Sequence, residues 1–143
     1  MNQQPHISAS PAHFAPLSAV PSTLRIPLAA RAFGDAMFPA LALGDVHAAR
    51  ILKALGDDGQ EWLRDRHSVY GVLARTQRFR ALAAQFLQDH PQGHVVNLGC
   101  GLSHYFQWLD NGQARMTDAD LPEVLEIRRA LLAVADEGHE VLA

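Results

Sequence analysis

The stretch His94–Leu102, HVVNLGCGL, decides the fold of this chain. Val95, Val96 and Leu98 form a short apolar run, rich in β-branched residues, that stops at Gly99. A run of this length closed by glycine favours a buried β-strand. The question is then which elements surround this strand and which chemical groups lie at its carboxyl end.

The residues that follow predict a second strand between two helices. A short helix is expected within 102–112, LSHYFQWLDNG, and a strand within 114–120, ARMTDAD. Residues 121–138, LPEVLEIRRALLAVADEG, predict a longer helix with Asp120 as N-cap, Pro122 in its first turn and Gly138 at its end. This β-α-β-α order implies parallel strands joined by a right-handed crossover.

The part of the chain before the first strand reads differently. Residues 1–22 carry four prolines among Ser, Ala and Gln, which predicts a disordered tail. Residues 23–92 predict a helical segment, with one helix after Asp45 and a long amphipathic one over residues 69–90. The expected organisation is therefore a tail over 1–22, helices over 23–92, and an α/β part over 93–143.

Composition excludes several classes of protein. The 143 residues are 48% hydrophobic and carry a formal net charge of -3, so neither nucleic acid nor an anionic membrane is indicated as a partner. The single cysteine allows no disulfide within the chain. The N-terminus has no secretory signal pattern and no segment is apolar enough to span a bilayer, so we expect a cytoplasmic protein.

The glycines and acids point to a nucleoside ligand. A Gly-x-Gly at the end of a parallel strand, here Gly99 and Gly101, permits a sharp turn and lets a ligand lie against bare backbone. An acid ending the neighbouring strand, Asp118 or Asp120, can accept hydrogen bonds from both ribose hydroxyls. The third glycine of the dinucleotide motif is replaced by His104, which disfavours a pyrophosphate and leaves S-adenosylmethionine as the common candidate.

Two segments carry a resemblance to a known family. VVNLGCGL and DADLPEVLEIRRALL resemble the bacterial members of the leucine carboxyl methyltransferase family, the O-methyltransferases often linked to polyketide tailoring. VLARTQRFRALAAQFL and IPLAARAF also resemble family segments, so the similarity runs from about residue 23 to the end. It implies an α/β, Rossmann-like class I methyltransferase fold and transfer of a methyl group from S-adenosylmethionine to an oxygen of a small-molecule hydroxyl or carboxylate.

The resemblance also implies roles for particular residues. Gly99 matches the glycine whose backbone approaches the cofactor, with Cys100 and Gly101 beside it in the same loop. Asp120 matches the acid that holds the ribose, and Asp118 is its neighbour. Two arginines complete the predicted cofactor-binding set: Arg75 matches a helix arginine that grips the cofactor's carboxylate, and Arg31 matches a second basic contact.

Alternatives remain open beside this interpretation. Cys100 is expected to fit the turn and not to act as a nucleophile, and the eight histidines, without metal-ligand spacing, are expected at the surface. Ser103-His104-Tyr105 stands where the family has Asp-Thr-Arg, and the chain stops at Ala143 where family members continue. A truncated N-terminal half is therefore expected, and a non-catalytic remnant or a nucleotide-dependent oxidoreductase are the competing functions. No residue is predicted to be catalytic.

Overall fold

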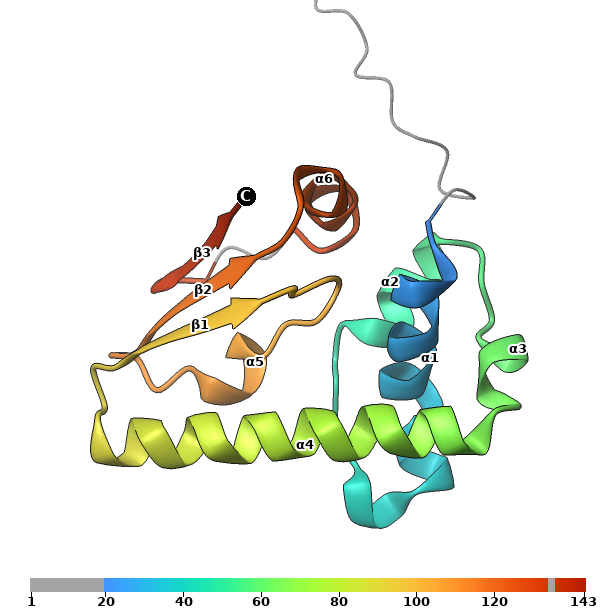
Figure 1. The fold of residues 1–143 in the computed structure, drawn as a ribbon, viewed down its shortest axis with the longest axis horizontal. Helices are drawn as coiled ribbons and strands as arrows, with labels where there is room; N and C mark the ends of the chain where they lie inside the picture. Colours follow the sequence, from blue (N-terminus) through green and yellow to red (C-terminus); the bar gives the residue numbers. More distant parts are fainter. Residues whose placement is uncertain (1–19, 134–135) are drawn as a thin grey trace, which may run out of the picture.

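The computed structural model describes residues 20–133 and 136–143 as a helical part beside a small α/β part (Figure 1). Most of the tail predicted over 1–22 lies outside the described residues. Val20, at its inner end, is buried in the core against the first helix. None of the helices in the described ranges combines the length and the apolar character needed to cross a bilayer.

The helical part is built on two long helices. α1 (Ser22–Met37) packs against α4 (Arg66–Asp89), with η2 (Pro39–Leu41), α2 (Ala48–Ala54) and α3 (Gln60–Leu63) between them in the chain. Asp65 caps α4 by accepting from the Ser68 N–H, and the helix stops before Pro91, as its sequence predicts.

The helix predicted after Asp45 is present as α2, but it begins at Ala48 with His47 in place of Asp45 as its N-cap residue. The Asp45 carboxylate accepts from the backbone N–H groups of His47 and Ala48 at 2.9 and 3.1 Å. Asp45 therefore fixes the first turn of α2, and its second carboxylate oxygen is left free to pair with Arg31 of α1.

The α/β part contains a parallel sheet in the order β1-β2-β3. β1 (His94–Leu98) pairs with β2 (Arg115–Ala119) in the register Leu98↔Ala119, and β2 pairs with β3 (His139–Leu142). Two helices connect them, α5 (Phe106–Leu109) and α6 (Pro122–Leu131). The predicted adjacency of the first two strands is confirmed.

Two expectations for the α/β part are wrong. α6 ends at Leu131 instead of near Gly138, because Leu131 and Leu132 turn into the core beside α1 and α2. Gly138, with φ of 86°, turns the chain into the unpredicted strand β3.

β1 is covered on one face of the sheet only. Val95 faces Leu87 of α4, Phe106 and Leu109 of α5, and Met116 of β2. On the opposite face Val96 and Leu98 are exposed, which contradicts the prediction of a buried strand. One of the core clusters therefore lies between the sheet and the helices α4 and α5, whereas Val96 and Leu98 on the other face of β1 stay exposed.

Candidate functional site

The glycine turn after β1 has a backbone conformation that is unfavourable for residues other than glycine. Gly99 and Gly101 have φ of 68° and 52°, in the left-handed region where glycine is favoured. A Cβ built on Gly99 would meet no atom within 4 Å. Gly99 is therefore required by its backbone angle, and it leaves an open surface of main chain against which a ligand could lie.

Asp120 lies beside this turn, as its position at the end of β2 predicts. Its Oδ2 accepts from the Gly101 N–H at 2.8 Å, and its Oδ1 accepts from the Leu121 N–H at 2.8 Å. The expectation that Asp120 caps α6 is wrong, because no side-chain cap bond is made to that helix. Instead the carboxylate holds the glycine turn, and its remaining lone pairs can accept further hydrogen bonds.

A cavity of about 310 Å³ opens beside the glycine turn. Its wall brings together five of the residues predicted from the sequence: Arg31, Arg75, Gly99, Cys100 and Gly101. The remaining wall comes from α1, α4, the end of β1 and the loop after it, including Pro27, Thr76 and Tyr105. The helical part and the α/β part therefore form this cavity jointly.

The two arginines of the cavity differ in their surroundings. Arg31 is buried, and its Nε lies 3.2 Å from Oδ2 of Asp45. Burial lowers the pKa of Arg31 below its usual value, and the Asp45 carboxylate opposes this shift. Arg75 is exposed and forms no ion pair with a described residue. The guanidinium of Arg31 is therefore already paired with Asp45, whereas the guanidinium of Arg75 is available to bind an anionic group of a ligand.

Asp118 is placed beneath the turn and away from this cavity. It is fully buried, with Oδ2 at 2.7 Å from Nη2 of Arg128 and 2.8 Å from Nε2 of His139. Its Oδ1 accepts from the Asn97 side-chain amide at 2.8 Å. Both carboxylate oxygens are thus engaged inside the protein, so Asp118 presents no open side to a ligand.

Arg128 is a residue next to this turn that the sequence patterns did not single out. It is 2% exposed and donates through Nη1 to the backbone oxygens of Gly101 at 3.0 Å and Ser103 at 2.5 Å. A signal was present, because Arg128 stands three residues from both Leu125 and Leu131, on the buried stripe of α6. Arg128 connects Asp118 to the backbone of the glycine turn.

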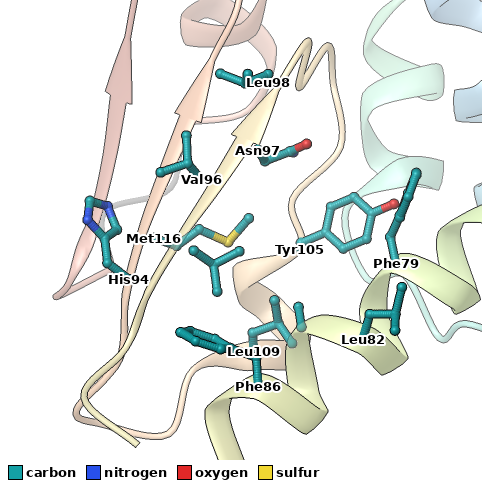
Figure 2. Close-up of a pocket in the computed structure, with 12 residues that line it drawn as sticks. Phe79, Leu82, Phe86, His94, Val96, Asn97, Leu98, Tyr105, Leu109 and Met116 are labelled. Atoms are coloured by element: carbon teal, nitrogen blue, oxygen red, sulfur yellow. The ribbon is translucent and has the colours of Figure 1, made fainter. Parts of the chain in front are cut away.

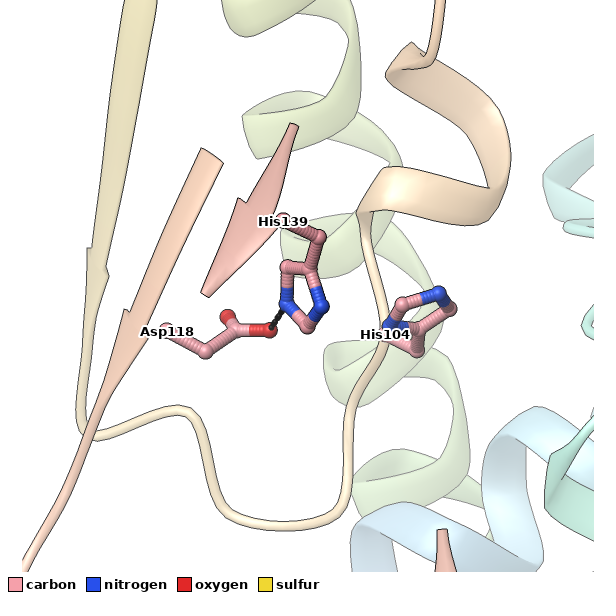
Figure 3. Close-up of side chains that lie close together, drawn as sticks. All are labelled: His104, Asp118 and His139. Atoms are coloured by element: carbon pink, nitrogen blue, oxygen red, sulfur yellow. Dashed lines mark hydrogen bonds and ion pairs between the residues drawn. The ribbon is translucent and has the colours of Figure 1, made fainter. Parts of the chain in front are cut away.

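Two histidines complete this buried cluster, against the expectation that the histidines lie at the surface. Figure 3 shows His139 directed at Asp118, with His104 close by. One ligand atom from each of these three side chains lies within 4.8 Å of the others, a spacing that a metal ion could use. The guanidinium of Arg128 already binds the Asp118 carboxylate, so a cation here would lie beside a fixed positive charge.

The protonation of His104 is affected by its burial. Burial lowers the pKa of His104 from 6.5, and the hydrogen bond that its ring donates to the Asp136 carboxylate opposes this shift. Nδ1 of His104 has no partner among the described residues. The ring of His104 also packs against the rings of His47 and His139. His104 thus occupies, as a buried packing residue, the position of the third glycine of a dinucleotide motif.

Cys100 lies between the two glycines and is buried. Burial raises the pKa of its thiol to about 11, with the positive charge of Arg128 opposing the shift. At neutral pH the thiol is protonated and therefore a poor nucleophile. This agrees with the expectation that Cys100 fits the turn.

The fold and the cavity define a class: an α/β protein with a parallel sheet and a cavity at the carboxyl end of its first strand. Residues 20–140 match the family model of the leucine carboxyl methyltransferases. The chain belongs to that family. It is 31% identical over 127 residues to the tetracenomycin polyketide synthesis O-methyltransferase TcmP of Streptomyces glaucescens, an alignment that covers 88% of this chain and 46% of TcmP. The chain thus spans about half the length of this relative.

Proposed function

We propose that this chain provides the cofactor-binding half of an S-adenosylmethionine-dependent O-methyltransferase with a Rossmann-like class I fold. Its acceptor would be a hydroxyl or carboxylate of a small molecule of the polyketide type. The observation that carries the proposal is the cavity itself: in a chain of this family, exposed main chain at Gly99 and the free guanidinium of Arg75 line one hollow beside Asp120.

The residues present fit this cofactor. Asp120, with lone pairs to spare, would accept from the ribose hydroxyls. Arg75 would bind the carboxylate of the methionine part, because a planar guanidinium matches a carboxylate with two hydrogen bonds. Gly99 would let the ligand approach the backbone, and Arg31, held by Asp45, would add positive charge to the same wall. Cys100 and Gly101 would form the floor of the site, and Asp118 would support it from below.

When bound, S-adenosylmethionine supplies a methyl group made electrophilic by its sulfonium charge. The contribution of the described residues is then to orient the ligand, since holding reactants in line lowers the barrier to a displacement. Tyr105 closes one side of the cavity, and burial raises the pKa of its phenol. We assign no general base to the described residues.

Calorimetric titration with S-adenosylhomocysteine tests the proposal. We expect saturable binding that Arg75→Met weakens by about 10- to 150-fold, the equivalent of a charged hydrogen bond of about 1.5–3 kcal/mol. Asp120→Asn should weaken it similarly. The matched control is Arg78→Met, an exposed arginine of the same helix that does not line the cavity.

Each alternative has its own outcome in the same experiment. Absence of heat at high ligand concentration would refute the cofactor site and support a non-catalytic remnant. Saturable binding of a nicotinamide dinucleotide in its place would support an oxidoreductase. Binding that is unchanged in both Arg75→Met and Asp120→Asn would place the ligand elsewhere.

A further inference from the structure

Three side chains able to bind a metal ion lie together beneath the glycine turn: His104, Asp118 and His139 (Figure 3). Their side chains are at most 4% exposed. One ligand atom of each lies within 4.8 Å of the others, and the centroids of the two imidazole rings are 5.0 Å apart. The three residues come from the loop after β1, from β2 and from β3, so the sheet brings together ligands that no short motif contains.

The two hollows of the structure differ from this cluster in their chemistry. The groove of about 500 Å³ between β1 and α4 has a mostly apolar lining, with His94 as the one histidine and no carboxylate among the described residues that form it (Figure 2). The cavity beside the glycine turn is lined by Arg31 and Arg75, which suit an anion. Ligands for a cation are therefore gathered at the buried cluster and not at either hollow.

The two nitrogens of the His104 ring are in different situations. Nε2 lies 3.0 Å from Oδ2 of Asp136, so it carries the proton when the ring is neutral. Nδ1 then has a lone pair, and it is buried without a partner among the described residues. In metal sites a ligating histidine almost always donates its other ring N–H to a carboxylate, a carbonyl or water, which fixes the tautomer. Asp136 therefore prepares His104 to bind through Nδ1, and burial favours the neutral ring that binding requires.

The hydrogen bond between His139 and Asp118 can be replaced by two metal–ligand bonds. Nε2 of His139 lies 2.8 Å from Oδ2 of Asp118. Zn²⁺ binds nitrogen and oxygen at about 2.0–2.2 Å, so two ligand atoms of one tetrahedral ion are roughly 3.4 Å apart. His139 and Asp118 would then separate by about 0.6 Å, and His104 would move by at most about 1.4 Å toward them. The proton on Nε2 of His139 would pass to Nδ1 of the same ring or to solvent.

Arg128 is the group in the cluster that opposes a cation. Its Nη2 lies 2.7 Å from Oδ2 of Asp118, so the carboxylate already has one positive neighbour. Asp136, bonded to His104, supplies a second carboxylate. Two carboxylates, one guanidinium and two neutral imidazoles leave a net negative charge that a divalent ion can neutralise. Arg128 should thus weaken metal binding without preventing it.

The ligand set selects the kind of ion. Imidazole nitrogen suits zinc and other first-row transition metals, whereas Mg²⁺ and Ca²⁺ prefer sites built from oxygen. Two imidazoles and one carboxylate occupy three positions of a tetrahedral ion, and water can take the fourth. Zn²⁺ is therefore the ion that this cluster fits best.

We propose that His104, Asp118 and His139 bind a divalent transition-metal ion of the zinc type, with Asp136 orienting the ring of His104. The ion would join the loop after β1 to β2 and β3, and would stabilise the loop that carries Gly101. None of the three ligands is among the residues that line the cavity beside the glycine turn, so the inference does not rest on the proposed function.

The test is a calorimetric titration of the full chain, stripped of metal by a chelator, with Zn²⁺ and separately with Mg²⁺. No S-adenosyl ligand is added. We expect one Zn²⁺ per chain, no saturable binding of Mg²⁺, and a higher urea midpoint with Zn²⁺. Asp136→Asn should weaken Zn²⁺ binding by about 10- to 100-fold, the usual cost of losing an outer partner of a ligating histidine, and His104→Gln by about 100-fold or more. The matched control is His67→Gln, an exposed histidine of α4, which should leave binding unchanged.

Nuclear magnetic resonance of the unsubstituted chain keeps the test independent of whether the variants fold. Long-range ¹H–¹⁵N spectra report which ring nitrogens bind the ion. We expect Zn²⁺ to shift the ring nitrogens of His104 and His139 and to leave those of His67 unchanged. Absence of Zn²⁺ binding would overturn the proposal. Shifts confined to other histidines, or binding that Asp136→Asn and His104→Gln leave unchanged, would show an adventitious ion only and would overturn it equally.

Discussion

Replacing Arg128 by methionine should remove a large part of the stability of the α/β part. Met keeps much of the volume and the apolar stem but leaves the Asp118 carboxylate, which is fully buried, without its guanidinium at 2.7 Å. Breaking one side of a buried ion pair costs about 3–5 kcal/mol. Domains of this size unfold at about 5–15 kcal/mol, so the loss is readily measured. Arg129→Met, at the exposed neighbouring position, is the matched control.

The assay is urea unfolding followed by far-UV circular dichroism, with Asp118→Asn and the double variant completing a cycle. Because Asp118→Asn removes the unpaired charge, the double variant should be less destabilised than the sum of the single ones, by about 0.5–3 kcal/mol. A cost of Arg128→Met within about 0.5 kcal/mol of that of Arg129→Met would refute the reasoning, since that is the ordinary spread of surface substitutions. Strict additivity would equally show that the pair does not act as a unit.

Three further results are expected. The free energy of unfolding should fall as pH drops below 6.5, because the unfolded chain protonates the His104 ring while burial resists it in the native state; His104→Gln should reduce this dependence in urea titrations, and His90→Gln should not. Cys100, with a thiol pKa near 11, should react with a disulfide reagent at pH 8 far more slowly in the native protein than in urea; equal rates would contradict its burial. Gly99→Ala should cost about 1–2 kcal/mol of stability through its left-handed backbone angle, and weaken S-adenosylhomocysteine binding further by occupying the cavity; an unchanged urea midpoint would contradict the strain.

Local sequence patterns predicted the elements whose signals are local. The long apolar stripe and Pro91 defined α4, and the β-branched run closed by Gly99 defined β1. The adjacency of β1 and β2 followed from a topological rule, because parallel strands joined by a crossover commonly lie side by side. This adjacency brings Asp120 to the glycine turn. Such features could be predicted because each depends on neighbours in the chain or on this general rule of strand connection.

The missed features depend on tertiary packing. No glycine or proline marks the end of α6 at Leu131; it ends there because Leu131 and Leu132 pack against the helical part. The four residues of β3 are too few for a periodicity to stand out. His104 has a partner, Asp136, that is distant in the chain, so no spacing rule reveals its burial.

The placement of Asp118 and Asp120 explains how a glycine turn is kept in one shape. Asp118 lies on the same face of β2 as the buried Met116 and points into the core toward Arg128, while Asp120 lies just past the strand end at the turn. Gly101 is consequently held at both of its backbone groups: its C=O accepts from Arg128 and its N–H donates to Asp120. Glycine loses more conformational freedom on ordering than any other residue. Because folding already restricts Gly101, a ligand that binds at the turn does not have to restrict it further. The entropy cost of binding is therefore lower, and the turn is preorganised.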